Sequence, residues 1–451
     1  MERWRFFRIS TGILSLGISA LAVWGAEPGA LRAGAARVDI TPPADAALPM
    51  NGFAGRTQGF KAIHDPVYVR AIVLDDGSTQ AALVAWESLY VPDAVWADVS
   101  KRVASDLGIR PENLLLAAVH DHGAPTLSLG SGQSGANTVA YTRKVEDDAV
   151  EAIRRAQARL EPARFGIGTG TAYLNVNRRE ATSNGGWALG HNENGPSDKT
   201  VTVIRFDSVS SGKPIAFFIN YPVHAVVMGP ENYQITGDIA GATSRFVEQH
   251  YLGKDHPRSD LGPRLQMRSA DAVGGDGVVA VWTSGPAGDQ NPVAMANGED
   301  FTLVGTLGEM LGEEVVRVAA GIKTTPQARI WGMQQVVTCP GRSLDPGSSQ
   351  RAGYKFTDAD PVNIRLSLLM LDRIALAGVS GEVFTLIHQR LKAESPFSHT
   401  VMVTHANGSS GYIPNDAAFD QTTYEITTSH LKPGCAESAI VNGFLDLMRR
   451  N

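Results

Sequence analysis

Short apolar runs alternate with amphipathic segments along most of the chain. Six runs of strand length are each followed by a loop containing Gly, Pro or Asp, as is typical of buried strands. Three other segments repeat apolar residues at helical spacing, with charged residues between them. Strands that alternate with helices predict an α/β layered sandwich, in which helices cover both faces of a large sheet. The predicted strands are Val67–Leu74, Ala81–Trp86, Leu114–Val119, Ile215–Ile219, Val278–Trp282 and Ile374–Val379; the predicted helices are Val145–Leu160, Leu303–Ala320 and Glu437–Arg449.

Two stretches fit neither pattern. Leu252–Gly277 and Arg342–Pro361 are interpreted as surface excursions. The chain shows no internal repeat, no low-complexity block and no long Pro/Ser linker, so the sequence predicts no domain boundary, although its length also allows two lobes. We therefore expect a single domain over residues 27–451.

The first 26 residues have the pattern of a secretory signal peptide. A basic start precedes the uncharged run 9–24, and the small residues Gly25 and Ala26 follow. An uncleaved membrane anchor is the alternative, because the run approaches spanning length. Its Gly and Ser content favours the cleaved signal, and no later stretch is apolar enough to span a membrane. We expect residues 1–26 to be removed and an exported protein, periplasmic or secreted, to remain.

Composition narrows the classes of function. The 451 residues are 43% hydrophobic and 19% charged, as in ordinary globular proteins. The 46 acidic and 40 basic residues give a net charge of -6 without a long run of either sign, so no nucleic-acid partner is expected. Cys339 and Cys435 are too few for a disulfide scaffold or a Cys-based zinc site. Whether these two cysteines pair stays open here.

Polar residues collect directly after several predicted strands. Leu114–Val119 leads into His120-Asp-His122, and residues two apart in an extended chain point the same way. Since ligands of α/β proteins gather beyond the carboxyl ends of strands, both imidazoles are expected to face a site. The spacing suits one metal ligand with a neighbouring base, although His-x-His alone is weak evidence for a metal.

Four more strand ends carry residues of the same kind. Each has a structural alternative: a hydrogen-bonded core His, a Glu at a helix N-terminus, or a Tyr in a turn. Together, two His and a Glu at one sheet edge fit a catalytic zinc site with an open position, where zinc lowers the pKa of water to about 7. The residues at these four strand ends are His224, the loop Gly285–Pro292, Glu382, and His405 with Tyr412.

Several short segments follow one another along nearly all of the predicted domain. They are Gly34–Pro43, Ile63–Pro66 with Arg70, His120–Pro125, Asn175–Arg178, Asn220–His224, Thr236–Asp238, Gly288–Asp289 with Pro292, Gly381–Glu382, Gly411–Pro414 and Tyr424–Glu425. The ordered set resembles the neutral, non-lysosomal ceramidase superfamily, whose bacterial members are exported zinc amidohydrolases. The resemblance implies an α/β sandwich around a large mixed sheet, in agreement with the pattern of strands and helices.

The resemblance also implies roles for individual residues. Zinc is expected as the cofactor, and a general base is expected at His122, beside the metal. Tyr424 falls at the position of a second active-site Tyr that stabilises a developing oxyanion. Arg178 falls in the active site, although Arg179 follows it directly. The expected zinc ligands are His120, His224, Glu382 and Tyr412.

The sequence departs from the family pattern in two respects. Ceramidases carry an essential Ser within Gly-Asp-x-Ser-Pro, whereas this chain has Asn291 at that position. A carboxamide cannot act as a nucleophile in the way of a Ser, but it can donate a hydrogen bond to a substrate carbonyl. Ceramidases also carry an immunoglobulin-like domain after the catalytic part, which we expect to be missing here. Both departures make ceramide a less secure substrate than an amide in general.

The sequence therefore predicts a zinc-dependent hydrolase that cleaves the amide bond of a small-molecule or lipid-like N-acyl amine. An esterase or lactonase on the same site is the nearest alternative, because amides and esters share the tetrahedral route. A binding protein that has lost turnover is the other alternative. Asp238 and Asp289 are candidates for orienting a ligand His or the active-site loop, with capping and turn roles equally open.

Overall fold

The computed structural model describes residues 1, 29–56, 58–130, 135–252, 277–296, 298–348 and 353–450. All but the first residue of the predicted signal peptide lies outside the described residues. Most of the predicted excursion Leu252–Gly277 also lies outside them, so that prediction is not tested.

The larger of two central sheets has eight strands and is mixed. Strands β11 and β13 run parallel, as do β5 and β6, whereas the other neighbours are antiparallel. The predicted large mixed sheet is therefore confirmed. In spatial order the strands are β13 (Val279–Ser284), β11 (Pro214–Tyr221), β10 (Thr200–Ser208), β7 (Glu161–Thr171), β2 (Arg32–Asp39), β4 (Tyr68–Asp75), β5 (Gln80–Trp86) and β6 (Leu114–Ala118).

A second sheet of four strands packs face to face against the first. Leu115 of β6 belongs to the same buried cluster as Leu369, Leu376 and Val403 of the second sheet, so the two sheets share one core. Its order is β16 (Ile330–Leu344), β17 (Phe356–Leu371), β18 (Ile374–Val379) and β20 (His399–Val403).

The prediction that Arg342–Pro361 is a surface excursion is partly wrong. Leu344 pairs with Phe356, so these residues form the end of the long β16–β17 hairpin. The pairing shifts register between Cys339 and Gly341. Because this end carries mostly polar, exposed side chains, no apolar alternation marked it as strand.

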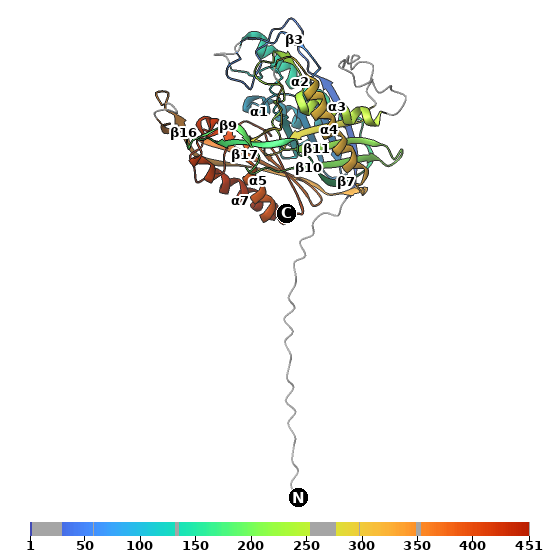
Figure 1. Ribbon diagram of the computed structural model, residues 1–451. Coiled ribbons are helices and arrows are strands. Elements are labelled where there is room, and N and C mark those ends of the chain that lie inside the picture. Colours follow the sequence, from blue (N-terminus) through green and yellow to red (C-terminus); the bar gives the residue numbers. More distant parts are fainter. Residues whose placement is uncertain are drawn as a thin grey trace.

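Helices cover the outer faces of this sandwich (Figure 1). Helices α1 and α2 pack on β2, β4 and β5, α3 and α4 pack on each other and on β7, β10 and β13, and α5 and α7 cover the second sheet. Each sheet thus has its partner sheet on one face, which the prediction of helices on both faces did not include. The helices are α1 (Asp93–Leu107), α2 (Ala136–Ala158), α3 (Asp238–Tyr251), α4 (Thr302–Ala320), α5 (Thr385–Glu394), α6 (Tyr424–Thr428) and α7 (Ala436–Arg449).

The three predicted helices are present, and two of them, α4 and α7, lie within one residue of the predicted bounds. Helix α2 begins nine residues before the predicted Val145, because Tyr141 and Thr138 are also buried on its inner side. Val145, Ala149 and Ala156 continue that side at spacings that bring them onto one stripe. The buried stripe explains why this long polar segment forms a helix against the sheet.

Short strands at the ends of the two sheets complete the fold. Strands β14 and β9 flank β8 in a three-stranded sheet, and β19 pairs with β21. The described short elements are β1 (Gly29–Ala30), β3 (Ala62–Ile63), β8 (Asn175–Ala181), β9 (Trp187–Asn192), β12 (Gln234–Ile235), β14 (Gln290–Pro292), β15 (Gln327–Ala328), β19 (Glu382–Val383), β21 (Tyr412–Ile413) and the 3-10 turns Pro111–Asn113 and Asp416–Asp420.

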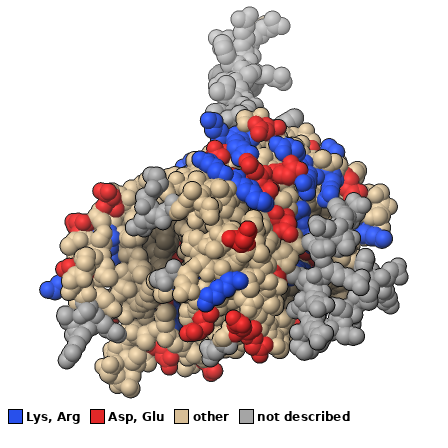
Figure 2. Space-filling view, turned by 90° about the horizontal axis from the view of Figure 1, so that it is seen from above, with Lys and Arg blue, Asp and Glu red and all other residues tan. Residues whose placement is uncertain are grey.

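Two further features bear on the earlier predictions. Cys339 and Cys435 form a disulfide, which joins β16 to the start of α7. On the face seen in Figure 2, basic and acidic side chains are interspersed rather than gathered into a patch of one sign. Among the described residues, none of the helices combines the length and the apolar run that a bilayer crossing requires.

Candidate active site

Two imidazoles are fixed by backbone carbonyls where strands of the large sheet end. His120 follows β6, and its Nδ1 lies 2.9 Å from the carbonyl oxygen of Leu89. His224 follows β11, and its Nδ1 lies 2.7 Å from the carbonyl oxygen of Ala287. Because a carbonyl only accepts, each Nδ1 carries the proton and each Nε2 is left as an acceptor. Burial lowers the pKa of His224 to about 3, so this ring is neutral.

Glu382 brings a carboxylate to the same two nitrogen atoms. Its Oε2 lies 3.2 Å from Nε2 of His120 and 3.4 Å from Nε2 of His224. Both Glu382 Oε2 and His224 Nε2 are buried without a hydrogen-bond partner among the described residues. Three acceptor atoms that face one another in this way repel unless a cation lies between them.

His122 is the third imidazole of the cluster. Its Nε2 lies 3.4 Å from Nε2 of His120, and its ring packs edge-on against Phe53 at 4.7 Å between centroids. The ring also fills the space beside Gly52, where an added Cβ would lie 2.2 Å from Nδ1 of His122. Burial, followed by the nearby His120 and His224, places the pKa of His122 well below its usual value. The His122 imidazole is therefore neutral.

Sequence reasoning placed Tyr412 beside Glu382, and the strand pairing brings the two together. Strands β19 and β21 pair in parallel, with Glu382 opposite Tyr412. Burial and then the Glu382 carboxylate raise the pKa of Tyr412 well above its usual value. The phenol is therefore protonated, and its oxygen lies 3.0 Å from Nη2 of Arg178.

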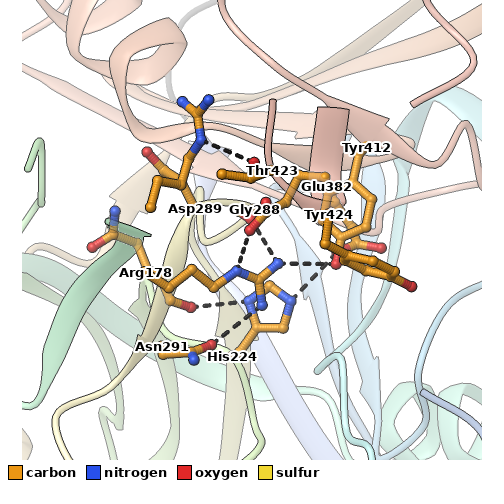
Figure 3. A network of polar contacts seen from close by, with 12 residues as sticks. Arg178, His224, Gly288, Asp289, Asn291, Glu382, Tyr412, Thr423 and Tyr424 are labelled. Carbon is orange, nitrogen blue, oxygen red and sulfur yellow. Dashed lines mark hydrogen bonds and ion pairs between the residues drawn. The ribbon is translucent and has the colours of Figure 1, made fainter. Parts of the chain in front are cut away.

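Arg178 of β8 connects the cluster to the second sheet's loops (Figure 3). Its Nε donates to Oε1 of Glu425 at 2.6 Å, Nη1 donates to Oδ1 of Asn291 at 3.2 Å, and Nη2 donates to the carbonyl oxygen of Gly288 at 2.9 Å. Protein acceptors thus engage all three guanidinium nitrogens, so Arg178 positions other residues. Arg179 points away from the cluster and donates from Nη2 to the carbonyl oxygen of Ala418 at 2.8 Å.

Tyr424 and Asn291 lie at the accessible side of the cluster. Tyr424 begins α6, is 45% exposed, and its ring meets that of Tyr412 edge-on at 5.9 Å. The Asn291 Oδ1 accepts from Arg178, which leaves the amide nitrogen as the free donor; its nearest partner is the sulfur of Met295 at 3.9 Å. Both residues therefore present hydrogen-bond donors beside the cluster.

Asp238 and Asp289 hold loops and do not contact the imidazoles. Oδ1 of Asp238 accepts from the amide of Val227 at 3.0 Å and Oδ2 from that of Met228 at 2.9 Å, which fixes the segment after His224. Burial raises the pKa of Asp238 to about 6. Asp289 accepts from the amide of Thr385 at 3.0 Å, so it connects the loop before Asn291 to α5.

His405 and Arg56 are site residues to which sequence reasoning gave no role. His405 stacks on His120 at 4.0 Å between centroids, and one nitrogen lies within 4.8 Å of ligand atoms of His120 and Glu382. The sequence signal for His405 was its position directly after a predicted strand. Arg56 donates from Nη2 to the carbonyl oxygen of His122 at 2.6 Å. No spacing in the sequence connects Arg56 with His122, 66 residues later.

Comparisons with known proteins agree with this architecture. The family model "Neutral/alkaline non-lysosomal ceramidase, N-terminal" matches residues 31–303. The neutral ceramidase of Pseudomonas aeruginosa is 28% identical over 233 residues, which are 48% of this chain and 33% of that protein. Neutral ceramidase 1 of Arabidopsis thaliana is 26% identical over 239 residues, which are 49% of this chain and 29% of that protein. The matched part thus spans about a third of the length of these curated relatives.

Solved structures show the same fold over more of the chain. The crystal structure of neutral ceramidase from Pseudomonas aeruginosa superimposes with a TM-score of 0.72 and 18% identity, covering 94% of this chain and 74% of that one. A ceramidase complexed with C2 also gives a TM-score of 0.72 at 18% identity, covering 93% and 74%. Because the family model matches more than half of the residues of this chain, the chain belongs to the neutral/alkaline non-lysosomal ceramidase family.

Proposed function

We propose that this protein is an exported, zinc-dependent hydrolase that cleaves the amide bond of an N-acyl amine. The observation that carries the proposal is the set of facing acceptor atoms. Among them, Nε2 of His224 and Oε2 of Glu382 are buried 3.4 Å apart, without a hydrogen-bond partner among the described residues. Two nitrogen donors and one carboxylate oxygen, with an open side, are the donor set of catalytic zinc sites. Family membership supports the same reading.

His120, His224 and Glu382 would hold the ion, with the oxygen of Tyr412 as a fourth donor. A zinc ion there supplies a Lewis acid that lowers the pKa of water and polarises a carbonyl group. The carbonyl contacts at Nδ1 keep the two imidazoles in the tautomer that ligation needs. The cluster His120, His122 and His224 also has the spacing of a metal-holding group, so the role of His122 needs its own test.

The chain's own residues supply the proton transfers and the binding of the substrate. We assign the general base to His122, which takes a proton at Nε2 from the attacking water and returns it to the leaving amine. The hydroxyl of Tyr424 donates to the carbonyl oxygen as that oxygen gains negative charge, and the amide of Asn291 orients the acyl group. Arg178 holds Asn291 and Tyr412 in place.

The test is a panel of substrates with controlled metal content. Purified protein is assayed on N-acyl amines including ceramide and on aryl esters and lactones, after chelation and after zinc is restored. We expect amide turnover that chelation removes and zinc restores. Turnover of esters or lactones alone would make the protein an esterase or lactonase. No turnover of any class by zinc-loaded protein would make it a binding protein.

A variant pair tests the base. His122→Ala is expected to lower kcat by about 100-fold or more, the usual range for a general base, while zinc content stays at the wild-type value. His191→Ala is the matched control, because this imidazole lies half-exposed on β9. Loss of zinc from His122→Ala would make His122 a ligand instead, and unchanged turnover would remove it from the mechanism.

Export is supported by the Cys339–Cys435 disulfide, because such bonds persist in oxidising compartments. The predicted signal peptide points the same way. Fractionation of producing cells, with sequencing of the mature N-terminus, tests this part. Protein retained in the cytoplasm with residues 1–26 intact would contradict it.

A further inference from the structure

A polar cavity lies across β8 from the imidazole cluster. Arg178 and Arg179 are adjacent on this strand, so their side chains point to opposite faces of it. Arg178 enters the cluster, whereas Arg179 lines an open cavity of about 220 Å³. Trp187 of β9 and the segment 415–421 line the same cavity.

The cavity is lined by polar groups whose hydrogen-bonding capacity the protein does not use. Arg179 is 5% exposed and binds the segment before Tyr424 through Nε and Nη2, but its Nη1 has no acceptor among the described residues. The side-chain amide of Asn415, which is 6% exposed, has no partner there either. The same holds for the side-chain amides of Asn194 and Gln421 and for the indole nitrogen of Trp187. Arg179 and Asn415 are buried residues, whereas Asn194 is exposed and Gln421 and Trp187 are half-buried. All five border the open cavity, so their unused hydrogen-bonding groups are available to a ligand that enters it.

The charges around the cavity favour a neutral ligand. Asp289 lines it, and its two carboxylate oxygens already accept from Thr385 and from Asn177 at 3.0 Å and 3.1 Å. Arg179 therefore faces the negative charge of Asp289, and that of Glu425 acts on it as well. A phosphate or carboxylate would add an anion beside carboxylates that already balance the guanidinium.

We propose that this cavity binds a single neutral sugar ring, free or as part of a larger glycoside. Hydroxyl groups donate and accept at once, which matches the carboxamides of Asn194, Asn415 and Gln421. The indole of Trp187 provides the flat apolar surface against which a sugar ring packs, and Arg179 Nη1 donates to a ring or hydroxyl oxygen. A volume of about 220 Å³ holds about seven waters, the size of one such ring. The proposal does not depend on the hydrolase activity.

The experiment is a binding titration of the purified full chain by calorimetry, with NMR of the indole signals. Glucose, galactose, mannose and N-acetylglucosamine are tested to about 50 mM, beside acetate and inorganic phosphate. We expect one of the sugars to bind saturably, one per chain, and acetate and phosphate not to bind at this cavity. Methyl glycosides of that sugar separate a free reducing sugar from a glycoside as the ligand.

Two variants place the binding at the cavity. Trp187→Ala and Asn415→Leu are each expected to weaken sugar binding at least tenfold, about 1.4 kcal/mol, while Tyr173→Ala, an exposed aromatic outside the cavity lining, leaves it unchanged. Thermal unfolding of each variant shows that it is folded. No saturable sugar binding, binding unchanged in Trp187→Ala, or binding of phosphate or acetate in place of sugar would each overturn the proposal.

Discussion

The two parts of the chain that meet at the candidate active site present their residues differently. Residues 31–303, which the family model matches, place His120 and His224 two and three residues after strands β6 and β11 of the eight-stranded sheet. The remaining residues place Glu382 and Tyr412 on two-residue strands that pair with each other. The first arrangement is dictated by a large sheet, whereas the second depends on contacts with the first. The candidate cation site therefore lies at the boundary between the two parts, called the seam below, and it requires both parts to be folded together.

The largest predicted effect comes from replacing one expected metal ligand in each of the two parts. Glu382→Gln and His224→Gln are each expected to reduce zinc from one ion per chain to a small fraction after dialysis, and turnover by more than about 100-fold. Replacing residues that merely support ligands already costs 10–100-fold. Elemental analysis and kcat measure both effects. Zinc retained by Glu382→Gln but lost from His224→Gln would show that the first part binds the ion alone.

The Arg178–Glu425 pair is the next strongest connection between the two parts. Both side chains are less than 10% exposed, and removal of one partner leaves a buried charge unpaired. Arg178→Met is expected to lower the free energy of unfolding by about 3–5 kcal/mol, measured by urea denaturation. Arg178→Met combined with Glu425→Leu should recover part of that loss.

The control for this pair is an exposed one on a single helix. Arg154 and Glu151 of α2 lie 2.7 Å apart with half and a third of their side chains exposed. Arg154→Met is expected to cost less than about 1 kcal/mol. If Arg178→Met costs no more than Arg154→Met, the buried pair does not hold the parts together.

Removal of the disulfide tests whether the stability of the second part can be changed without changing the candidate cation site. Cys339 and Cys435 are 96 residues apart and both lie in the second part. Replacing both by Ala is expected to lower the free energy of unfolding by about 2–5 kcal/mol, because the unfolded chain gains freedom. Zinc content should stay at one per chain, since neither cysteine lies in the cluster. A loss of zinc together with stability would show that the disulfide also sets the seam.

The same contrast explains what the sequence predicts. The apolar run Leu114–Val119 is a strand because every residue of β6 is buried, and the polar residues after it could be placed at the sheet edge. Glu382 could be placed through the family resemblance, but β19 is too short to leave a periodic pattern. The division of the strands between two sheets could not be predicted, because pairing partners far apart in the chain are fixed by tertiary packing.

His405 shows more clearly which part of the site the sequence could not predict. Its position after a strand is visible in the sequence, yet only the fold shows its ring stacked 4.0 Å from that of His120. The contact joins residues 285 positions apart, and no spacing rule relates them. The same holds for Arg179, whose direction away from Arg178 follows from strand geometry but whose cavity is formed by a distant segment.

Another contact between the two parts lies away from the imidazole cluster, and it gives the smallest predicted effect. His388 of α5 is buried, and its Nδ1 lies 3.7 Å from Oδ2 of Asp198 in the first part. Burial lowers the pKa of His388 from 6.5 to about 4. Between these values the unfolded chain binds a proton that the folded chain does not, so stability is full above pH 6.5 and falls as the pH drops toward 4.

The size of this effect follows from the same two pKa values. The full loss is about 3 kcal/mol, of which about 1 kcal/mol has appeared by pH 5.5. His388→Gln removes the titrating group, so the difference in free energy of unfolding between wild type and variant should shrink from pH 7.5 to pH 5.5 by about 1 kcal/mol. A difference that does not change with pH would mean that His388 is not held neutral. Any loss of stability at low pH would then have to come from the imidazoles around Glu382. In that case metal-loaded protein would keep its free energy of unfolding at pH 5.5.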